Sequence, residues 1–223
     1  MSVGQTLRSV PLFAELDDQA IDRLSRVTRT KNYPKNSVIV FEDDPGDALY
    51  VVNSGQVKVV LIGEDGREVI LSVLGDGSFF GEMALIDDQP RSAHVIAMED
   101  SRLLVLHRDD FHRCLEETPR IALGLLRQLS RRLRSADDKI GGLVLLDVPG
   151  RVARLLIQLA DEGDGVVISR RVTHHTLGQM IGSSRETVSR TIKDLATKGL
   201  IAVTQATIEI QDRKGLERMG GLA

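Results

Sequence analysis

The segment THHTLGQMIGSSRETVSRTIKDLATKGLI, residues 173–201, contains two amphipathic stretches separated by Gly182 and Ser183. Apolar residues recur at helical spacing on both sides of this break, which predicts helices over about 174–181 and 184–198. Gly182 lies where the turn needs a residue that tolerates a positive φ angle. The segment therefore predicts a helix–turn–helix, and it decides how the C-terminal third of the chain is interpreted.

The sequence on both sides of this motif completes a larger unit. An amphipathic helix is predicted over 151–161 and a short strand over 165–169. The runs 200–205 and 207–211 are expected to pair as a small hairpin. A helix, a strand, a helix–turn–helix and a hairpin in this order describe a winged helix.

The second helix of the motif is expected to expose the side chains that read DNA. Ser183 is expected to cap this helix, with Glu186 three residues later completing a Ser-x-x-Glu capping box. A recognition helix enters the major groove, where Arg can bind guanine N7 and O6 and Glu can accept from cytosine N4. The alternative is that Glu186 only caps the helix and the arginines are solvated surface. The candidate DNA contacts are Thr173, His174, Ser184, Arg185, Glu186, Ser189 and Arg190.

The net charge by itself argues against a polyanionic partner. The 223 residues carry 29 Lys+Arg and 32 Asp+Glu, a formal net charge of -3. Residues 148–223, however, carry 11 basic and 8 acidic side chains, net +3, and residues 1–147 carry the other 18 and 24, net -6. The basic excess lies on the predicted winged helix. Because this excess is modest, we expect DNA affinity to depend on a dimer and on specific contacts more than on bulk charge.

The N-terminal part of the chain has a different pattern. Short β-branched runs recur between about residues 37 and 107, and Gly, Asp, Asn or Pro bounds each of them. Many short strands at near-regular spacing predict an antiparallel sandwich or jelly roll, so the fold class is α+β. Residues 6–33 are expected to form short helix and loop, with Asp17–Asp18 capping a helix. The predicted strands are 37–41, 48–52, 56–62, 67–74, 93–97 and 101–107.

A long helix is predicted from about residue 109, with an interruption near Pro119. Six residues within it are spaced 3, 4, 3, 4 and 3 apart, which is a heptad seam for two-stranded pairing. The alternative is a helix that packs on its own domain. The predicted domains are a β sensor domain over 1–108, a dimerisation helix and hinge over 109–147, and a winged helix over 148–223. The seam consists of Leu126, Leu129, Leu133, Ala136, Ile140 and Leu143.

A second informative stretch is FFGEMALIDDQPRSAHV, residues 79–95. Gly81 permits close backbone approach, and the turn after it is predicted to be helical, so its free N–H groups suit a phosphate. Arg91 can add a charge-assisted contact, and Ser92 a hydroxyl hydrogen bond. Glu82 would repel an anion unless it accepts from a hydroxyl, and the ribose 2′-OH beside a cyclic phosphate supplies one. The stretch therefore fits a cyclic nucleotide better than a bare anion, with a structural Glu82–Arg91 ion pair as the alternative.

Together these motifs resemble a known family. Residues 173–201 resemble the helix–turn–helix of the cyclic AMP receptor protein/fumarate–nitrate regulator (CRP/FNR) family of bacterial transcription factors, and residues 79–95 resemble the phosphate-binding cassette of cyclic-nucleotide-binding domains. The resemblance implies a homodimer that reads palindromic DNA with TGTGA-like half-sites, since Arg185, Glu186 and Arg190 match the family pattern. The nucleotide-binding residues that it implies are Gly81, Glu82, Met83, Ala84, Arg91 and Ser92.

The sequence departs from the family pattern in two places. Three residues after Thr173 the sequence has Thr176, where the Thr-x-x-Glu box of the family has Glu. On the long helix, the flanking runs SRRL and LLDV place Ala136 and Asp137 where the cyclic AMP branch carries a Thr-Ser pair that contacts the base. Ala136 cannot hydrogen-bond a base, whereas an ionised Asp137 can accept from adenine or from the edge of guanine. Cyclic AMP is the first choice of effector, with cyclic GMP or cyclic di-GMP as alternatives.

The resemblance also implies how the parts communicate. The run LLDVPGR, residues 145–151, resembles the hinge of the family, whose Asp, here Asp147, begins the second domain. Ligand binding is then expected to lengthen or rotate the coiled coil and to reorient the recognition helices, and RNA polymerase is an implied partner. The alternatives are a family member with no ligand or another effector, and a nucleotide-controlled regulatory protein that does not act on DNA.

Other functional classes are disfavoured. Cys114 is the one cysteine, which excludes an internal disulfide framework and a multi-cysteine zinc or iron–sulfur site. No catalytic partner for this thiol is evident, so we expect no enzyme activity. His174–His175 lack an acidic third ligand, so we expect no metal either. No apolar run approaches the ~18 residues of a membrane span and no signal peptide is evident, so we expect a cytoplasmic protein without a membrane partner.

Overall fold

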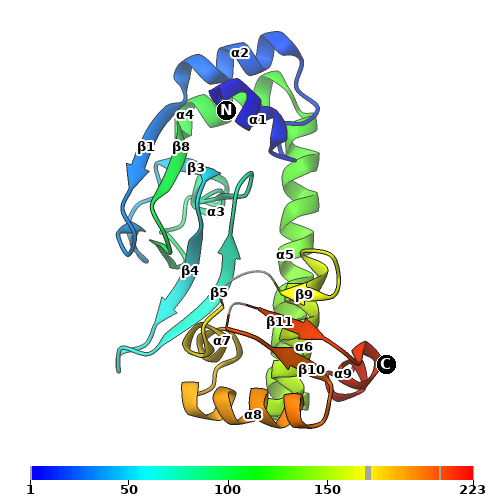
Figure 1. Cartoon of the computed structure of the whole chain (residues 1–223). Coiled ribbons are helices and arrows are strands. Elements are labelled where there is room, and N and C mark those ends of the chain that lie inside the picture. Colours follow the sequence, from blue (N-terminus) through cyan, green and yellow to red (C-terminus); the bar gives the residue numbers. More distant parts are fainter. Residues whose placement is uncertain (1, 169–171, 206, 223) are drawn as a thin grey trace. The chain divides into compact units, whose positions relative to one another are not determined.

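The computed structural model describes residues 2–168, 172–205 and 207–222. The chain forms two compact units, Met1–Leu133 and Arg134–Ala223, called unit 1 and unit 2 below. Figure 1 shows the elements of both units. The boundary between the units falls inside one long helix, so each unit is described by itself.

Unit 1 contains the antiparallel sandwich that the sequence predicted. In the described part of the unit, two four-stranded sheets are formed, with strand orders β1-β8-β3-β6 and β2-β7-β4-β5. The buried residues between them include Val52, Phe80, Val95 and Leu103. The strands are β1 (Arg29–Tyr33), β2 (Val38–Val40), β3 (Ala48–Ser54), β4 (Val57–Ile62), β5 (Glu68–Leu74), β6 (Phe79–Phe80), β7 (His94–Ala97) and β8 (Ser101–His107).

The expectation of helix and loop over residues 6–33 is wrong for the last part of that range. Residues 29–33, RTKNY, form strand β1, although most of its side chains are exposed and the run lacks apolar alternation. The strand forms because β8 supplies its backbone partners, with Arg29 opposite Val105 and Tyr33 opposite Ser101. A tertiary pairing therefore overrides weak local preference.

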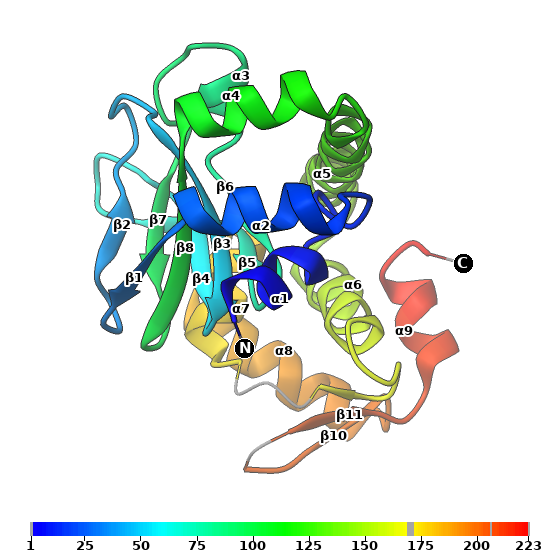
Figure 2. The ribbon, with the colours of Figure 1, turned by 90° about the horizontal axis from the view of Figure 1, so that it is seen from above.

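Helices close one end of the sandwich. Asp17 caps α2 (Asp18–Val27) by accepting from the Ala20 amide at 2.7 Å, as the sequence predicted. Seen from above in Figure 2, α2 and α4 (Arg108–Glu117) run alongside each other, and they are in contact. A second core lies beneath them, where Phe13, Ile21 and Phe111 are buried. The other helices that begin in unit 1 are α1 (Val3–Ser9), α3 (Met83–Ile86) and α5 (Arg120–Leu145).

The long helix breaks near Pro119 as predicted, and α5 then continues to Leu145. Ile121 and Leu125 are buried against unit 1, and half-buried Leu129 packs on the same core. A second apolar stripe on α5 remains exposed, and its solvent-accessible fractions exceed one half. The large apolar side chains of the seam that are exposed are Leu126 (59%), Leu133 (64%), Ile140 (60%) and Leu143 (55%). One face of α5 thus packs on its own unit, and another face is available for a partner.

Unit 2 contains the predicted winged helix. Asp147 caps its first helix by accepting from the Gly150 amide at 2.9 Å. The sheet has the order β10-β11-β9, and buried residues such as Leu156, Leu177, Val188 and Leu195 form the core. The last helix, α9, was not predicted. The elements are α6 (Val148–Asp161), β9 (Val167–Ile168), α7 (His174–Ile181), α8 (Arg185–Thr197), β10 (Ile201–Val203), β11 (Ile208–Ile210) and α9 (Arg213–Met219).

Candidate functional site

The first candidate site lies in unit 1, where β6 leads into the short helix α3. Gly81 joins them with a φ angle of +87°, which a residue with a side chain rarely adopts. A Cβ atom at Gly81 would lie 2.6 Å from Nη1 of Arg91 and 3.0 Å from the carbonyl oxygen of Ala48. The glycine therefore allows the Arg91 guanidinium to reach the backbone at this point.

Arg91 is held inside this site and is only 5% exposed. Its Nη1 donates to the Gly81 carbonyl at 2.8 Å and its Nη2 to the Ala48 carbonyl at 2.9 Å. The guanidinium also lies 5.8 Å from the centre of the Tyr50 ring. Desolvation lowers the pKa of Arg91, but an arginine remains protonated in proteins. Two of its five N–H donors are used in this way, so others remain for an anion.

Glu82 is the second buried charge of the site, at 1% exposure. Its Oε1 accepts from Nη1 of Arg132 at 2.5 Å, so the alternative of a Glu82–Arg91 ion pair is wrong. Arg132 comes from α5, donates also to the Phe79 carbonyl and lies 5.2 Å from the centre of the Phe79 ring. The other carboxylate oxygen, Oε2 of Glu82, is buried without a hydrogen-bond partner among the described residues.

The remaining predicted residues of the cassette differ in their exposure. Ala84 is buried and Met83 is half-exposed on α3, and the exposed Ser92 contacts the Met83 sulfur at 3.8 Å. Because α3 has only four residues, few peptide dipoles add up, and attraction for an anion rests on Arg91 more than on a helix dipole. Ala136 and Asp137 lie on α5 within unit 2, and both are exposed. Their contact with a base stays a prediction.

Sequence reasoning missed Arg132. Arg132 is one of several charged residues between the seam positions, and its spacing does not distinguish it from Arg131 or Arg134. Its ion pair joins residues 50 positions apart in the chain. Only the folded chain shows which of these arginines reaches Glu82.

The second candidate site is the helix–turn–helix of unit 2. Thr173 caps α7 by accepting from the Thr176 amide at 3.1 Å, and Gly182 ends that helix with a φ angle of 66°. The turn is tight, because a Cβ atom at Gly178 would lie 2.6 Å from the carbonyl oxygen of Ser183. Gly178 is therefore needed as much as Gly182, although the sequence pattern indicated only the latter.

The cap of the recognition helix α8 corrects the sequence prediction by one residue. Ser184, not Ser183, caps α8, and its hydroxyl accepts from the Thr187 amide at 3.1 Å. Ser183 belongs to the turn, where its amide donates to the Gly178 carbonyl at 2.9 Å. Glu186 is therefore not the third residue after the cap, so the expected capping box does not form.

The N-terminal half of α8 exposes polar side chains in the predicted manner. Val188, Ile192 and Leu195 are buried on the opposite face. The pKa of Glu186 is lowered, first by a backbone N–H at the helix start and then by the Ser184 hydroxyl, so this carboxylate stays an acceptor at neutral pH. The exposed residues at this end of α8 are Ser184, Arg185, Glu186, Ser189 and Arg190.

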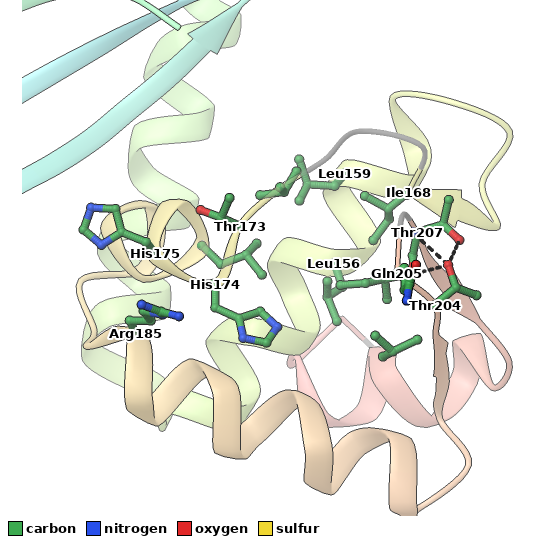
Figure 3. A pocket seen from close by; sticks show the side chains of 14 residues that line it. Leu156, Leu159, Ile168, Thr173, His174, His175, Arg185, Thr204, Gln205 and Thr207 are labelled. Carbon is green, nitrogen blue, oxygen red and sulfur yellow. Dashed lines mark hydrogen bonds between the residues drawn. The ribbon is translucent and has the colours of Figure 1, made fainter. Parts of the chain in front are cut away.

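A hollow of about 660 Å³ lies next to this helix within unit 2. Apolar residues of α6, α7 and β9 form its floor, and polar side chains form its rim. His174 is half-buried there, and Thr173 is exposed. Figure 3 shows the rim, with His174, His175 and Arg185 on one side and Thr204, Gln205 and Thr207 of the hairpin on the other.

Metal binding, a reactive thiol and a membrane-spanning helix find little support in the part of the chain that the structure describes. No group of His, Cys, Asp or Glu there could hold a metal ion. Burial raises the pKa of Cys114 to about 11, which makes its thiol a weak nucleophile. Within the same ranges, no helix combines the length and apolar character that a membrane crossing needs.

Two family models match the chain. The cyclic nucleotide-binding domain matches residues 30–118, which contain the Arg91–Glu82 site. The Crp-like helix-turn-helix domain matches residues 150–219, which contain the exposed recognition helix. The two candidate sites thus fall in two separately matched domains.

Relatives span nearly the whole chain. The CRP-like cAMP-activated global transcriptional regulator of Mycobacterium tuberculosis is 32% identical over 221 residues, across 97% of this chain and 99% of the relative. The cyclic AMP receptor protein of Thermus thermophilus is 36% identical over 218 residues, across 97% and 100%. Among solved structures, the c-di-GMP-responsive global regulator CLP of Xanthomonas campestris is 28% identical with a TM-score of 0.74, across 87% of this chain and 99% of that chain.

Proposed function

Because the chain belongs to the CRP/FNR family of cyclic nucleotide-responsive, DNA-binding transcription regulators, we propose that it acts as a homodimer whose reading of a TGTGA-like palindrome is controlled by cyclic AMP. Arg91 and Ser92 would bind the cyclic phosphate, and Glu82 the ribose. Arg185, Glu186 and Arg190 would contact base edges, and RNA polymerase would be the partner of the DNA-bound dimer. Such a protein would work in the cytoplasm.

The observation that carries the nucleotide assignment is the unpartnered oxygen of Glu82. A buried carboxylate oxygen without a donor costs free energy, typically about 1–3 kcal/mol. A bare phosphate relieves this cost poorly, because its negative charge is repelled by the buried carboxylate. A ribose 2′-OH beside a cyclic phosphate donates to Glu82 while the phosphate accepts from Arg91. The two buried charges of the site therefore match the two halves of a cyclic nucleotide.

Calorimetric titration of the purified protein with cyclic AMP, cyclic GMP and cyclic di-GMP tests the assignment. We expect the tightest binding for cyclic AMP. Cyclic di-GMP is the second candidate, because Asp137 can accept from a guanine edge and the similar CLP structure is that of a c-di-GMP-responsive regulator. If cyclic di-GMP bound more tightly than cyclic AMP, it would be assigned as the effector. If none of the three bound, nucleotide control would be refuted.

The ribose contact predicts a specific discrimination. A hydrogen bond to a charged acceptor contributes about 1.5–3 kcal/mol, so 2′-deoxy cyclic AMP should bind the wild-type protein about 10- to 140-fold more weakly than cyclic AMP. Glu82→Ala removes the acceptor, and the variant should discriminate between the two ligands by less than about threefold. Comparing the two ligands on one variant cancels any general damage to the site. Equal discrimination by wild type and variant would contradict the role of Glu82.

The exposed stripe on α5 supports the dimer. Leu133 and Ile140 are one heptad apart and are more than half exposed, and large exposed apolar surfaces on a soluble protein usually mark an interface. A second copy of α5 with the same stripe would bury both seams in a parallel pair. Such a dimer would present two recognition helices to the two halves of a palindrome.

Leu133→Glu should separate the protomers. A carboxylate at this seam position would be buried in the pair without a partner, which costs several kcal/mol, so we expect dimer dissociation to rise by at least about 100-fold. Sedimentation equilibrium measures the change. Ser135→Glu adds the same charge at an exposed, off-seam position two residues away and should leave the dimer intact. Equal dissociation constants for the two variants would refute the seam.

A further inference from the structure

Two side chains of α4 bind the backbone at the C-terminal end of α3. Nη2 of Arg108 donates to the Ala84 carbonyl at 2.7 Å, and Nη1 forms an ion pair with Asp88. One turn further along α4, Nε2 of His112 lies 2.7 Å from the Leu85 carbonyl. Two successive carbonyl groups of the cassette helix are therefore held by a different helix.

Arg108 also ties in the loop before β3. Its Nη2 donates to the Gly46 carbonyl at 2.7 Å, and its amide donates to the Asp47 carbonyl at 2.8 Å. This loop and α3 pack closely, because a Cβ atom at Gly46 would lie 2.3 Å from Cβ of Ala84. Arg108 is thus the common partner of two segments that touch each other.

The same loop is bound to the anion-binding arginine. The Asp43 amide donates to the Arg91 carbonyl and the Arg91 amide to the Asp44 carbonyl, both at 2.9 Å. A displacement of Arg91 or α3 on ligand binding would therefore pull on the groups that Arg108 holds. Arg108 is itself the first residue of α4, and Thr118 and Pro119 link α4 to α5, which continues into unit 2.

We propose that Arg108 and His112 are positioning residues that hold the cassette helix α3 on α4 and thereby transmit ligand occupancy to the dimerisation helix. This inference rests on the proposed function. The two residues contact neither phosphate nor base in this scheme. They act through α3, so their removal should affect the link between ligand and DNA more than the affinity of either.

The test measures the factor by which saturating cyclic AMP tightens binding of the full-length protein to a TGTGA palindrome. Allosteric coupling is typically about 5- to 150-fold, and we expect Arg108→Gln to reduce the factor to below about twofold. Arg113→Gln is the matched control, because Arg113 lies on the same helix, is 65% exposed and pairs only with Asp110 among the described residues. The control should keep the wild-type factor.

A pair of variants at the other contact guards against simple misfolding of Arg108→Gln. The amide group of His112→Gln can still donate to the Leu85 carbonyl, whereas His112→Leu cannot. We expect His112→Gln to keep the coupling factor and His112→Leu to lose most of it while still binding cyclic AMP. If His112 had a merely structural role, its replacement would change the melting temperature and leave the coupling factor unchanged.

The outcomes separate the two proposals. A wild-type protein whose DNA affinity does not respond to cyclic AMP would refute the proposed control by cyclic AMP. A wild-type protein that responds, together with Arg108→Gln and His112→Leu variants that respond equally at saturation, would refute the positioning role alone.

Discussion

Arg91→Gln should weaken cyclic AMP binding by about 30- to 4,000-fold, because losing one partner of a buried, hydrogen-bonded charge pair costs about 2–5 kcal/mol. The phosphate would then face a neutral amide in place of a guanidinium that is only 5% exposed. Isothermal titration of the wild type and the variant measures the loss. DNA binding should no longer respond to cyclic AMP at concentrations that saturate the wild type.

Two further variants separate this loss from a general loss of structure. Arg91 also satisfies the Gly81 and Ala48 carbonyls, so its replacement also lowers the free energy of unfolding. Arg91→Lys keeps the charge but not the planar fork, and its affinity should lie between those of the other two proteins. Arg102→Gln removes an exposed arginine of β8 and should bind cyclic AMP as the wild type does. Affinity within about threefold of wild type for a folded Arg91→Gln would refute the pocket assignment.

Arg185→Ala should strongly weaken specific DNA recognition while leaving much of the non-specific binding. A bidentate contact to guanine contributes about 1–3 kcal/mol of discrimination, and a dimer makes it twice, so specific affinity should fall by about 30- to 20,000-fold. Fluorescence anisotropy with a TGTGA palindrome and a scrambled duplex measures both affinities. The fall should be concentrated on the palindrome.

Lys198→Ala is the matched control for this experiment. It removes the same charge from the other end of α8, where Lys198 is exposed at the helix C-terminus. We expect it to weaken binding to both duplexes equally and slightly, as a change in bulk charge does. If Arg185→Ala weakened binding to both duplexes to the same extent, Arg185 would contact phosphate and not a base.

Local patterns predicted the elements of this fold well where one period or one turn residue decides the structure. The β-branched runs became strands of the sandwich, and the apolar spacing over 173–201 became α7 and α8. Asp17 caps the helix that follows it, as predicted, since a side-chain cap needs only residues close in sequence. The cap of α8 was misplaced by one residue, because two serines are adjacent and the Ser-x-x-Glu spacing favoured Ser183, whereas Ser184 caps the helix.

The candidate residues Gly81, Glu82 and Arg91 were identified from one short stretch of sequence, but their partners were not. Glu82 could have paired with Arg91, which is near it in the chain, and instead pairs with Arg132. Arg91 instead donates to the Ala48 carbonyl, 43 residues away in the chain. The sequence indicated which groups are candidates to bind a ligand, and the fold showed which of their atoms are without a hydrogen-bond partner among the described residues.

Periodicity and turn chemistry act over a few residues, so the sequence alone predicted the order of the parts, the recognition helix and the residues that the two candidate sites contain. The folded chain was needed to show that RTKNY is a strand, that Arg132 binds Glu82 and that Arg108 and His112 bind the backbone of α3. These contacts join residues far apart in the chain, where similar side chains compete and distance in space selects one. A local pattern of residues gives the period of a helix or strand, whereas the tertiary partner of a side chain depends on the path of the whole chain.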